Sequence, residues 1–164
     1  LLLFAQELEQ AVQAPDVVLE KWRAPTRQML PRPAAAGNFS ALRAVFSAME
    51  PLTERYPPLL AHCACAPQHL PEQSAQRILT YYLYKYFLQA AYDGRLLEKV
   101  QFAAASLLML EALLWPMPPD PAQQIRCISL FSRETEHSEE NLAQFFSWAG
   151  TSRHPMLLSL LLQT

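Results

Sequence analysis

The clearest structural pattern in this chain is the stretch 76–115, QRILTYYLYKYFLQAAYDGRLLEKVQFAAASLLMLEALLW. Apolar residues fill nearly every position over 78–91, which predicts a helix that is buried on all sides and therefore central. Asp93 and Gly94 end this helix, because glycine readily adopts the left-handed conformation that closes helix C termini. The aliphatic pattern then resumes and predicts a second helix over 95–115. Two helices joined by one tight turn form an αα-hairpin.

Prolines and capping residues divide the rest of the chain into further helices. Pro71 suits the first turn of the first hairpin helix. Asp120 and Pro121 combine an N-cap with a proline at the first helical position, and they predict a helix over 121–137. Another helix is expected over 138–150. Runs of β-branched residues, which favour strands, are missing from the sequence. We predict an all-α fold, an irregular multi-helix bundle of about six to eight helices around a central αα-hairpin.

The 164 residues suit a single domain. We expect three parts within the range 1–164: N-terminal helices over 1–56, an irregular loop over 57–71 and a C-terminal helical core over 72–164. Inside the first part, a helix is predicted over 1–13, and Asp16 can cap a second helix that ends before a linker over 31–37. Asn38 or Ser40 then starts a third helix. A short apolar tail over 155–162 is expected to dock on the bundle.

The composition suggests that this domain has a covalent neighbour. Hydrophobic residues make up 51% of the chain and charged residues 17%, so we expect more apolar surface than one small domain buries. The chain begins Leu1-Leu2-Leu3-Phe4, without methionine and without the basic segment of a signal peptide. We interpret it as a piece of a longer protein, whose missing N-terminal domain is a partner.

Charge and cysteine content exclude several classes of protein. The net charge of −2 and the scattered arginines argue against nucleic-acid binding. No apolar run reaches the length of a membrane span, so we expect no membrane insertion. Three cysteines in a chain of this size are typical of a reducing compartment, which favours a cytoplasmic location.

One segment carries residues that could bind a metal ion. His62, Cys63 and Cys65 lie close together, and His69 follows four residues later. Imidazole and thiolate are zinc ligands, but the spacing lacks the usual pair of two-residue gaps. We favour an irregular loop with incidental thiols, and these four residues stay weak metal candidates.

A second group of polar residues ends the helix predicted over 121–137. Its motif contains Ser132, Arg133, Glu136 and His137. One stripe of this helix carries Arg126, Leu130, Arg133 and His137. Two interpretations stay open. The motif is either an ordinary polar C-terminal turn, in which Glu136 ties helix to helix, or an anion or substrate contact beside an active site on another domain.

The first hairpin helix carries a cluster of tyrosines: Tyr81, Tyr82, Tyr84, Tyr86 and Tyr92. Five residues at these spacings cannot share one face. Core packing with hydroxyl groups at the rim is the default, and Tyr82, Tyr86 and Tyr92 are the residues considered as core or substrate aromatics. An aromatic cage for a protonated or methylated amine is the alternative. Phosphate-binding loops, HExxH and a nucleophile elbow are missing, so no catalytic residue is assigned.

These segments together resemble the C-terminal half of the flagellin lysine-N-methylase family. The resemblance rests on Tyr81-Tyr82-Leu83-Tyr84-Lys85-Tyr86-Phe87-Leu88, on Ala91-Tyr92-Asp93-Gly94, on the aliphatic helix and on Phe131-Ser132-Arg133-x-x-Glu136-His137. It covers roughly residues 76–146. Order and spacing carry most of its weight.

The resemblance implies methyl transfer from S-adenosylmethionine to lysine side chains of flagellin, in the bacterial cytoplasm. It also implies an iron–sulfur cluster in the cysteine-rich N-terminal segment of the full-length protein. This chain would be the C-terminal portion of such a methyltransferase, without the complete catalytic half and without a cofactor of its own. We expect it to be inactive alone.

A function from another class remains open. An all-α chain of this kind could be a non-catalytic binding or dimerisation module, such as the ligand domain of a transcriptional regulator. The hydrophobic hairpin would then line a pocket or an interface.

Overall fold

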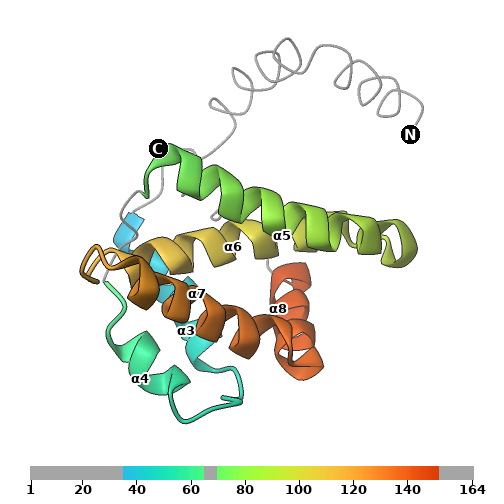
Figure 1. Cartoon of the computed structure of the whole chain (residues 1–164). Coiled ribbons are helices and arrows are strands. Elements are labelled where there is room, and N and C mark those ends of the chain that lie inside the picture. The colour runs from blue at the N-terminus through green and yellow to red at the C-terminus, as the bar shows by residue number, and fades with distance from the viewer. Residues whose placement is uncertain (1–34, 65–69, 152–164) are drawn as a thin grey trace. The chain divides into compact units, whose positions relative to one another are not determined.

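The computed structural model describes residues 35–64 and 70–151 (Figure 1). Six helices occur in these ranges, numbered as in the figure: α3 (Ala35–Ser47), α4 (Tyr56–Ala61), α5 (Glu72–Asp93), α6 (Leu96–Leu114), α7 (Pro121–Glu136) and α8 (Glu139–Thr151). No strand occurs within them. The predicted all-α multi-helix fold is confirmed.

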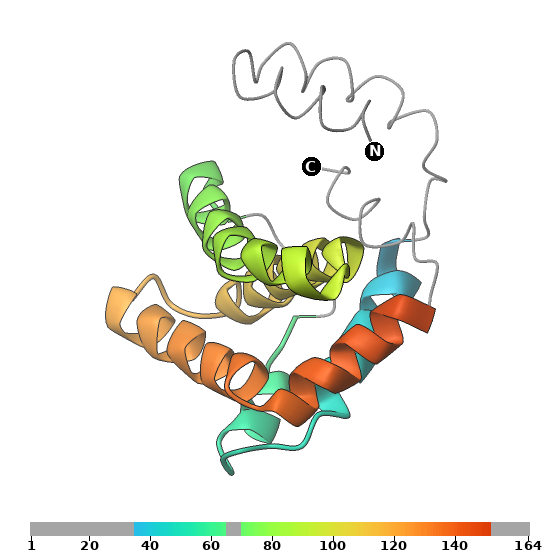
Figure 2. The same cartoon turned by 90° about the vertical axis from the view of Figure 1, so that its right-hand side faces the viewer.

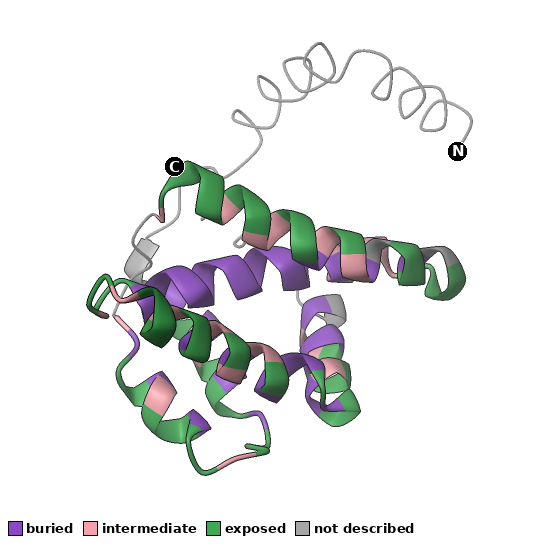
Figure 3. Cartoon of the chain, in the orientation of Figure 1, coloured by how far each residue is buried: buried purple, intermediate pink, exposed green. Residues whose placement is uncertain are grey.

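Helix α6 is the central element of the described part of the chain, because it packs on α5, α7 and α8. Every residue from Gln101 to Leu114 is buried, which Figure 3 shows as a continuous purple ribbon. The sequence pattern favoured α5 for this place, and that expectation was wrong. Tyr82 and Tyr86 are buried on one side of α5, but Tyr84 is 78% exposed and Tyr92 93% exposed. Both hairpin helices are rich in apolar residues. Which of them is covered on both sides depends on where the other helices pack, and composition does not show this.

The turn between α5 and α6 has the predicted form. Gly94 has φ of 68°, the left-handed conformation that glycine adopts without steric cost. Asp93 accepts a hydrogen bond from the Arg95 backbone N–H at 3.0 Å and lies 3.0 Å from the Lys99 ammonium. Arg95 also donates to the Phe146 carbonyl at 2.8 Å, and the Lys99 ammonium lies 3.9 Å from the Phe146 ring centre. The hairpin turn is therefore fixed to α8.

Aromatic rings connect the helices through the core. Phe102 on α6 has four ring neighbours with centroids 5.0–5.7 Å away: Tyr82, Tyr86, Phe145 and Phe146. Phe46 on α3 continues this network, with the Phe131 centroid at 5.5 Å and the Phe145 centroid at 5.8 Å. Offset and edge-to-face rings add stabilisation beyond the area that they bury. Side chains far apart in the sequence thus hold α3, α5, α7 and α8 around α6.

Two helix starts differ from the sequence predictions. Helix α3 begins at Ala35, inside the stretch predicted as a linker over 31–37, because alanine has the highest helix propensity. Helix α4 begins at Tyr56 and occupies the first part of the segment predicted as an irregular loop over 57–71. Pro57 and Pro58 stand in its first turn, where a backbone N–H has no partner inside the helix and proline is tolerated.

The other helix ends agree closely with the patterns. The Asp120 side chain accepts a hydrogen bond from the Ala122 N–H at 3.0 Å, and Pro121 opens α7 as predicted. Figure 2 shows α7 and α8 meeting at a sharp corner, which lies at His137 and Ser138. Helix α8 passes Gly150, which was expected to end it, and runs to Thr151.

Some predictions fall outside the described residues. These are the helix over 1–13, the second helix that Asp16 can cap and the apolar tail over 155–162. Among the helices that the structure describes, none is long and apolar enough to cross a membrane.

Candidate functional site: an arginine groove and a buried glutamate

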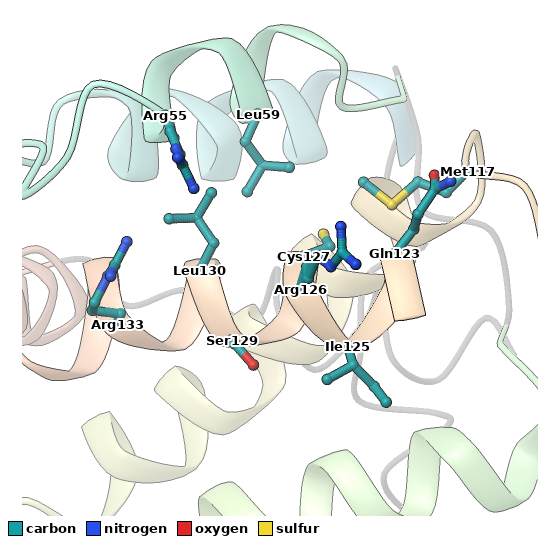
Figure 4. Close-up of a pocket in the computed structure, with 10 residues that line it drawn as sticks. All are labelled: Arg55, Leu59, Met117, Gln123, Ile125, Arg126, Cys127, Ser129, Leu130 and Arg133. Atoms are coloured by element: carbon teal, nitrogen blue, oxygen red, sulfur yellow. The ribbon is translucent and has the colours of Figure 1, made fainter. Parts of the chain in front are cut away.

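A pocket of about 600 Å³ lies between α4 and α7 (Figure 4). Arg55, the N-cap residue of α4, and Leu59 point from the α4 side toward α7. Arg126, Leu130 and Arg133 point back from α7, where spacings of four and three residues place them on one face. We call the surface lined by these five residues the arginine groove.

The arginine groove is strongly positive. Its pocket has three arginines and no aspartate or glutamate among its lining residues. Arg55, Arg126 and Arg133 are all exposed, and within the described ranges their side chains form no ion pair or hydrogen bond. Leu59 and Leu130 are half-buried between them. The groove therefore combines guanidinium groups free to bind an anion with an apolar floor.

A second cluster surrounds Glu136, at the end of α7 and facing α5. Its side chain is 0% exposed, and Oε2 lies 2.6 Å from the Lys85 ammonium on α5. The same oxygen accepts hydrogen bonds from the Tyr86 hydroxyl at 3.2 Å and from the Tyr81 hydroxyl at 3.3 Å. The other oxygen, Oε1, is buried and has no hydrogen-bond partner among the described residues. Glu136 therefore joins α7 to α5 through three donors at one oxygen.

The charge of Glu136 alters the acidity of its neighbours. Burial alone would lower the pKa of Lys85, but the hydrogen bonds to Glu136 and Tyr81 outweigh it and raise this pKa. Burial raises the pKa of Tyr82 and Tyr86, and the nearby carboxylate raises both further. All three groups therefore stay protonated at neutral pH. A protonated Lys85 is a poor nucleophile and a good ion-pair partner.

The tyrosine cluster divides between core and surface. Tyr82 and Tyr86 are core residues, as the default interpretation had it, whereas Tyr92 is exposed and packs in no core. An amine does lie against aromatic rings, but it is the side-chain ammonium of Lys85, a residue of the same chain. The Lys85 ammonium lies 5.6 Å from the ring centres of both Tyr81 and Tyr86, within the range of cation–π attraction.

The four residues of the predicted motif do not form one site. Ser132 is half-buried, and Arg133 lies in the arginine groove. Glu136 faces α5 instead. His137 ends α7 as its C-cap, with its backbone N–H bonded to the Arg133 carbonyl at 3.3 Å and its side chain exposed. Glu136 therefore does tie helix to helix, and an anion or substrate contact by the motif stays a prediction.

The sequence patterns missed a buried polar corner beneath the motif. Glu134 accepts hydrogen bonds from the Leu52 N–H at 2.6 Å, the Thr53 N–H at 3.3 Å and the Thr53 hydroxyl at 2.5 Å. Asn141 donates to the carbonyls of Glu50 and Glu134 at 2.9 and 2.8 Å. One signal could have revealed Glu134, since it follows the buried Phe131 by three residues and so lies on the core face of α7.

The weak metal candidates are not brought together in the described residues. His62 is exposed, with Nδ1 2.7 Å from the Pro58 carbonyl oxygen, while Cys63 is buried. Cys65 and His69 lie outside the described residues. The ranges 35–64 and 70–151 contain no group of three or more histidine, cysteine or acidic side chains that could hold a metal ion.

The fold and the two clusters define an all-α domain with a positive groove and a cross-helix carboxylate. Comparison with protein families shows to which family this domain is related. The family model described as the FliB lysine N-methylase C-terminal domain matches residues 71–159, more than half of the 164 residues. The chain therefore belongs to this family, and the resemblance seen in the sequence is confirmed. No curated protein and no solved structure matches the chain.

The matched range begins with α5 and includes α6, α7 and α8. The chain is thus the C-terminal portion of a lysine N-methylase. Both the Lys85–Glu136 pair and two of the three groove arginines lie inside this range, whereas Arg55 precedes it.

Proposed function

We propose that the chain is the C-terminal helical portion of a bacterial, cytoplasmic protein-lysine N-methyltransferase that transfers methyl groups from S-adenosylmethionine to flagellin. The family match over 71–159 carries this proposal. The resemblance of the Ser132-Arg133-x-x-Glu136-His137 motif supports flagellin as the substrate.

The role we propose for this portion is to cover the catalytic half and to position the protein substrate. Two features support a positioning role. The core is closed by aromatic packing around α6, which gives a rigid support. The exposed arginines of α7 provide a surface that another chain can contact.

The described residues do not fit an iron–sulfur cluster. Such a cluster is held by about four cysteine thiolates. Cys63 and Cys127 are the cysteines among the described residues, both buried, and burial raises the pKa of Cys127 to about 11, which disfavours a thiolate. The described residues therefore offer too few thiolates to hold such a cluster.

The test is a methylation assay with the full-length protein, purified flagellin and isotopically labelled S-adenosylmethionine. We expect label in flagellin lysines, located by peptide mass spectrometry, and none without enzyme. The variant His137→Ala should lower the labelling. Because the His137 side chain is exposed, the variant should have the same free energy of unfolding as the wild type. Unlabelled flagellin with wild-type enzyme would refute the proposal, and unchanged labelling with H137A would remove His137 from it.

A further inference from the structure

The arginine groove has the properties of a peptide-binding site. Arg55, Arg126 and Arg133 converge on one pocket of about 600 Å³, and no lining residue is acidic. Three like charges repel one another, so the groove is least favourable when empty and gains from a negatively charged occupant. Each guanidinium can bind a carboxylate through two parallel hydrogen bonds. Charge complementarity therefore selects an acidic ligand.

The spacing of the arginines selects a chain with several charges over one small anion. Arg126 and Arg133 are seven residues apart on α7, which corresponds to about 10.5 Å along the helix axis. An extended peptide in the polyproline II conformation presents residues i and i+3 on the same side, about 9 Å apart. Two acidic residues at this spacing could each meet one of these arginines. Arg55 faces them from α4 and can bind either carboxylate.

The apolar part of the groove lies between the charges. Leu130 stands between Arg126 and Arg133 on α7, and Leu59 faces α7 from α4. Met117 adds a half-buried side chain to the same pocket. An aliphatic side chain between two acidic residues would contact this floor and shield the ion pairs from water, which strengthens them.

We propose that the arginine groove binds an acidic segment of the protein substrate, in which two carboxylates three residues apart flank an aliphatic side chain. The identity of the partner as the methylated protein rests on the function proposed above. The groove would hold this segment while a lysine elsewhere in the same protein reaches the catalytic half. Arg126 and Arg133 would then be positioning residues that set affinity for the substrate.

A binding experiment with the full-length protein tests the site without methylation. The probe is a fluorescent peptide, Gly-Ser-Glu-Leu-Ser-Glu-Ser-Gly, and the control peptide carries Gln in place of both Glu residues. We expect the acidic peptide to bind, and to bind more weakly as salt is added. The double variant Arg126→Gln/Arg133→Gln should weaken binding by roughly tenfold or more.

Two controls separate charge from folding. Glutamine keeps most of the side-chain length, and the circular dichroism spectrum should not change. The matched variant Arg77→Gln removes an exposed arginine of α5 that does not line the groove, and it should bind the peptide like the wild type. Equal binding by R126Q/R133Q and wild type would overturn the proposal. So would equal binding of the acidic and neutral peptides, or no binding by the wild type.

Steady-state methylation of flagellin then distinguishes this proposal from the one on which it rests. With R126Q/R133Q we expect a raised KM and an unchanged kcat, because the groove binds the substrate away from the reacting atoms. If the full-length protein binds the peptide but does not methylate flagellin, flagellin is refuted as the substrate, and the acidic-peptide site is still supported. Methylation with an unchanged KM in the variant refutes substrate binding in the arginine groove but agrees with the proposed methyltransferase activity.

Discussion

Replacing Glu136 by alanine should reveal which of its three donors depends on it most. The carboxylate oxygen accepts from the Tyr86 hydroxyl inside the core, whereas Tyr81 is half exposed and Lys85 about one-third exposed. Without Glu136, Lys85 and Tyr81 can turn to water, so their loss costs little. The Tyr86 hydroxyl stays buried without an acceptor, which costs about 1–3 kcal/mol. We expect Glu136→Ala to lower the free energy of unfolding by about 2–3 kcal/mol.

Double-mutant cycles measure the two couplings separately. Tyr86→Phe removes the stranded hydroxyl, so Glu136→Ala should cost less in its presence, with a coupling of about 1–2 kcal/mol. Lys85→Met should couple to Glu136 by less than about 1 kcal/mol. The assay is urea unfolding of the full chain followed by circular dichroism. Glu54→Ala, at an exposed position, is the control and should change stability by less than about 0.5 kcal/mol. A larger coupling for Lys85 than for Tyr86 would refute this reasoning.

Three further predictions concern other parts of the fold. Glu134→Ala removes the acceptor that the Thr53 hydroxyl and two partly buried backbone N–H groups share, so urea unfolding should show a loss of about 1–3 kcal/mol, whereas Glu134→Gln, which keeps an acceptor, should lose less than half of that. Gly94→Ala should cost about 1 kcal/mol through backbone conformation alone, because open space surrounds the added methyl group; a loss above about 3 kcal/mol in the same assay would contradict this. Burial raises the pKa of Cys127 from 9.0 to about 11, so the folded state keeps a proton that the unfolded chain releases. The contribution of this protonated thiol to stability is complete below about pH 9 and is lost between about pH 9 and 11. The free energy of unfolding should therefore fall less steeply with pH across this window for Cys127→Ala than for the wild type. Parallel curves for the two proteins would count against the prediction.

Local patterns predicted most of the helices. Asp120 and Pro121 open α7 and Gly94 closes α5, because capping and the left-handed turn depend on residues adjacent in the chain. The stripe of Arg126, Leu130 and Arg133 was visible for the same reason, since one helix fixes its own faces. The order of the hairpin and the motif after it was also enough to indicate the family, which the match over 71–159 confirmed.

Contacts between residues close in the chain were therefore enough to predict the all-α class, the αα-hairpin and the polar stripe on α7. The tertiary structure decided that α6 and not α5 is the central helix, because α7 and α8 cover α6 on its other side. It also brought Arg55 next to the arginines of α7 and Lys85 next to Glu136. These partners are separated by 51 residues or more in the sequence. Such pairs depend on how helices pack against one another, which no periodicity within a single helix encodes.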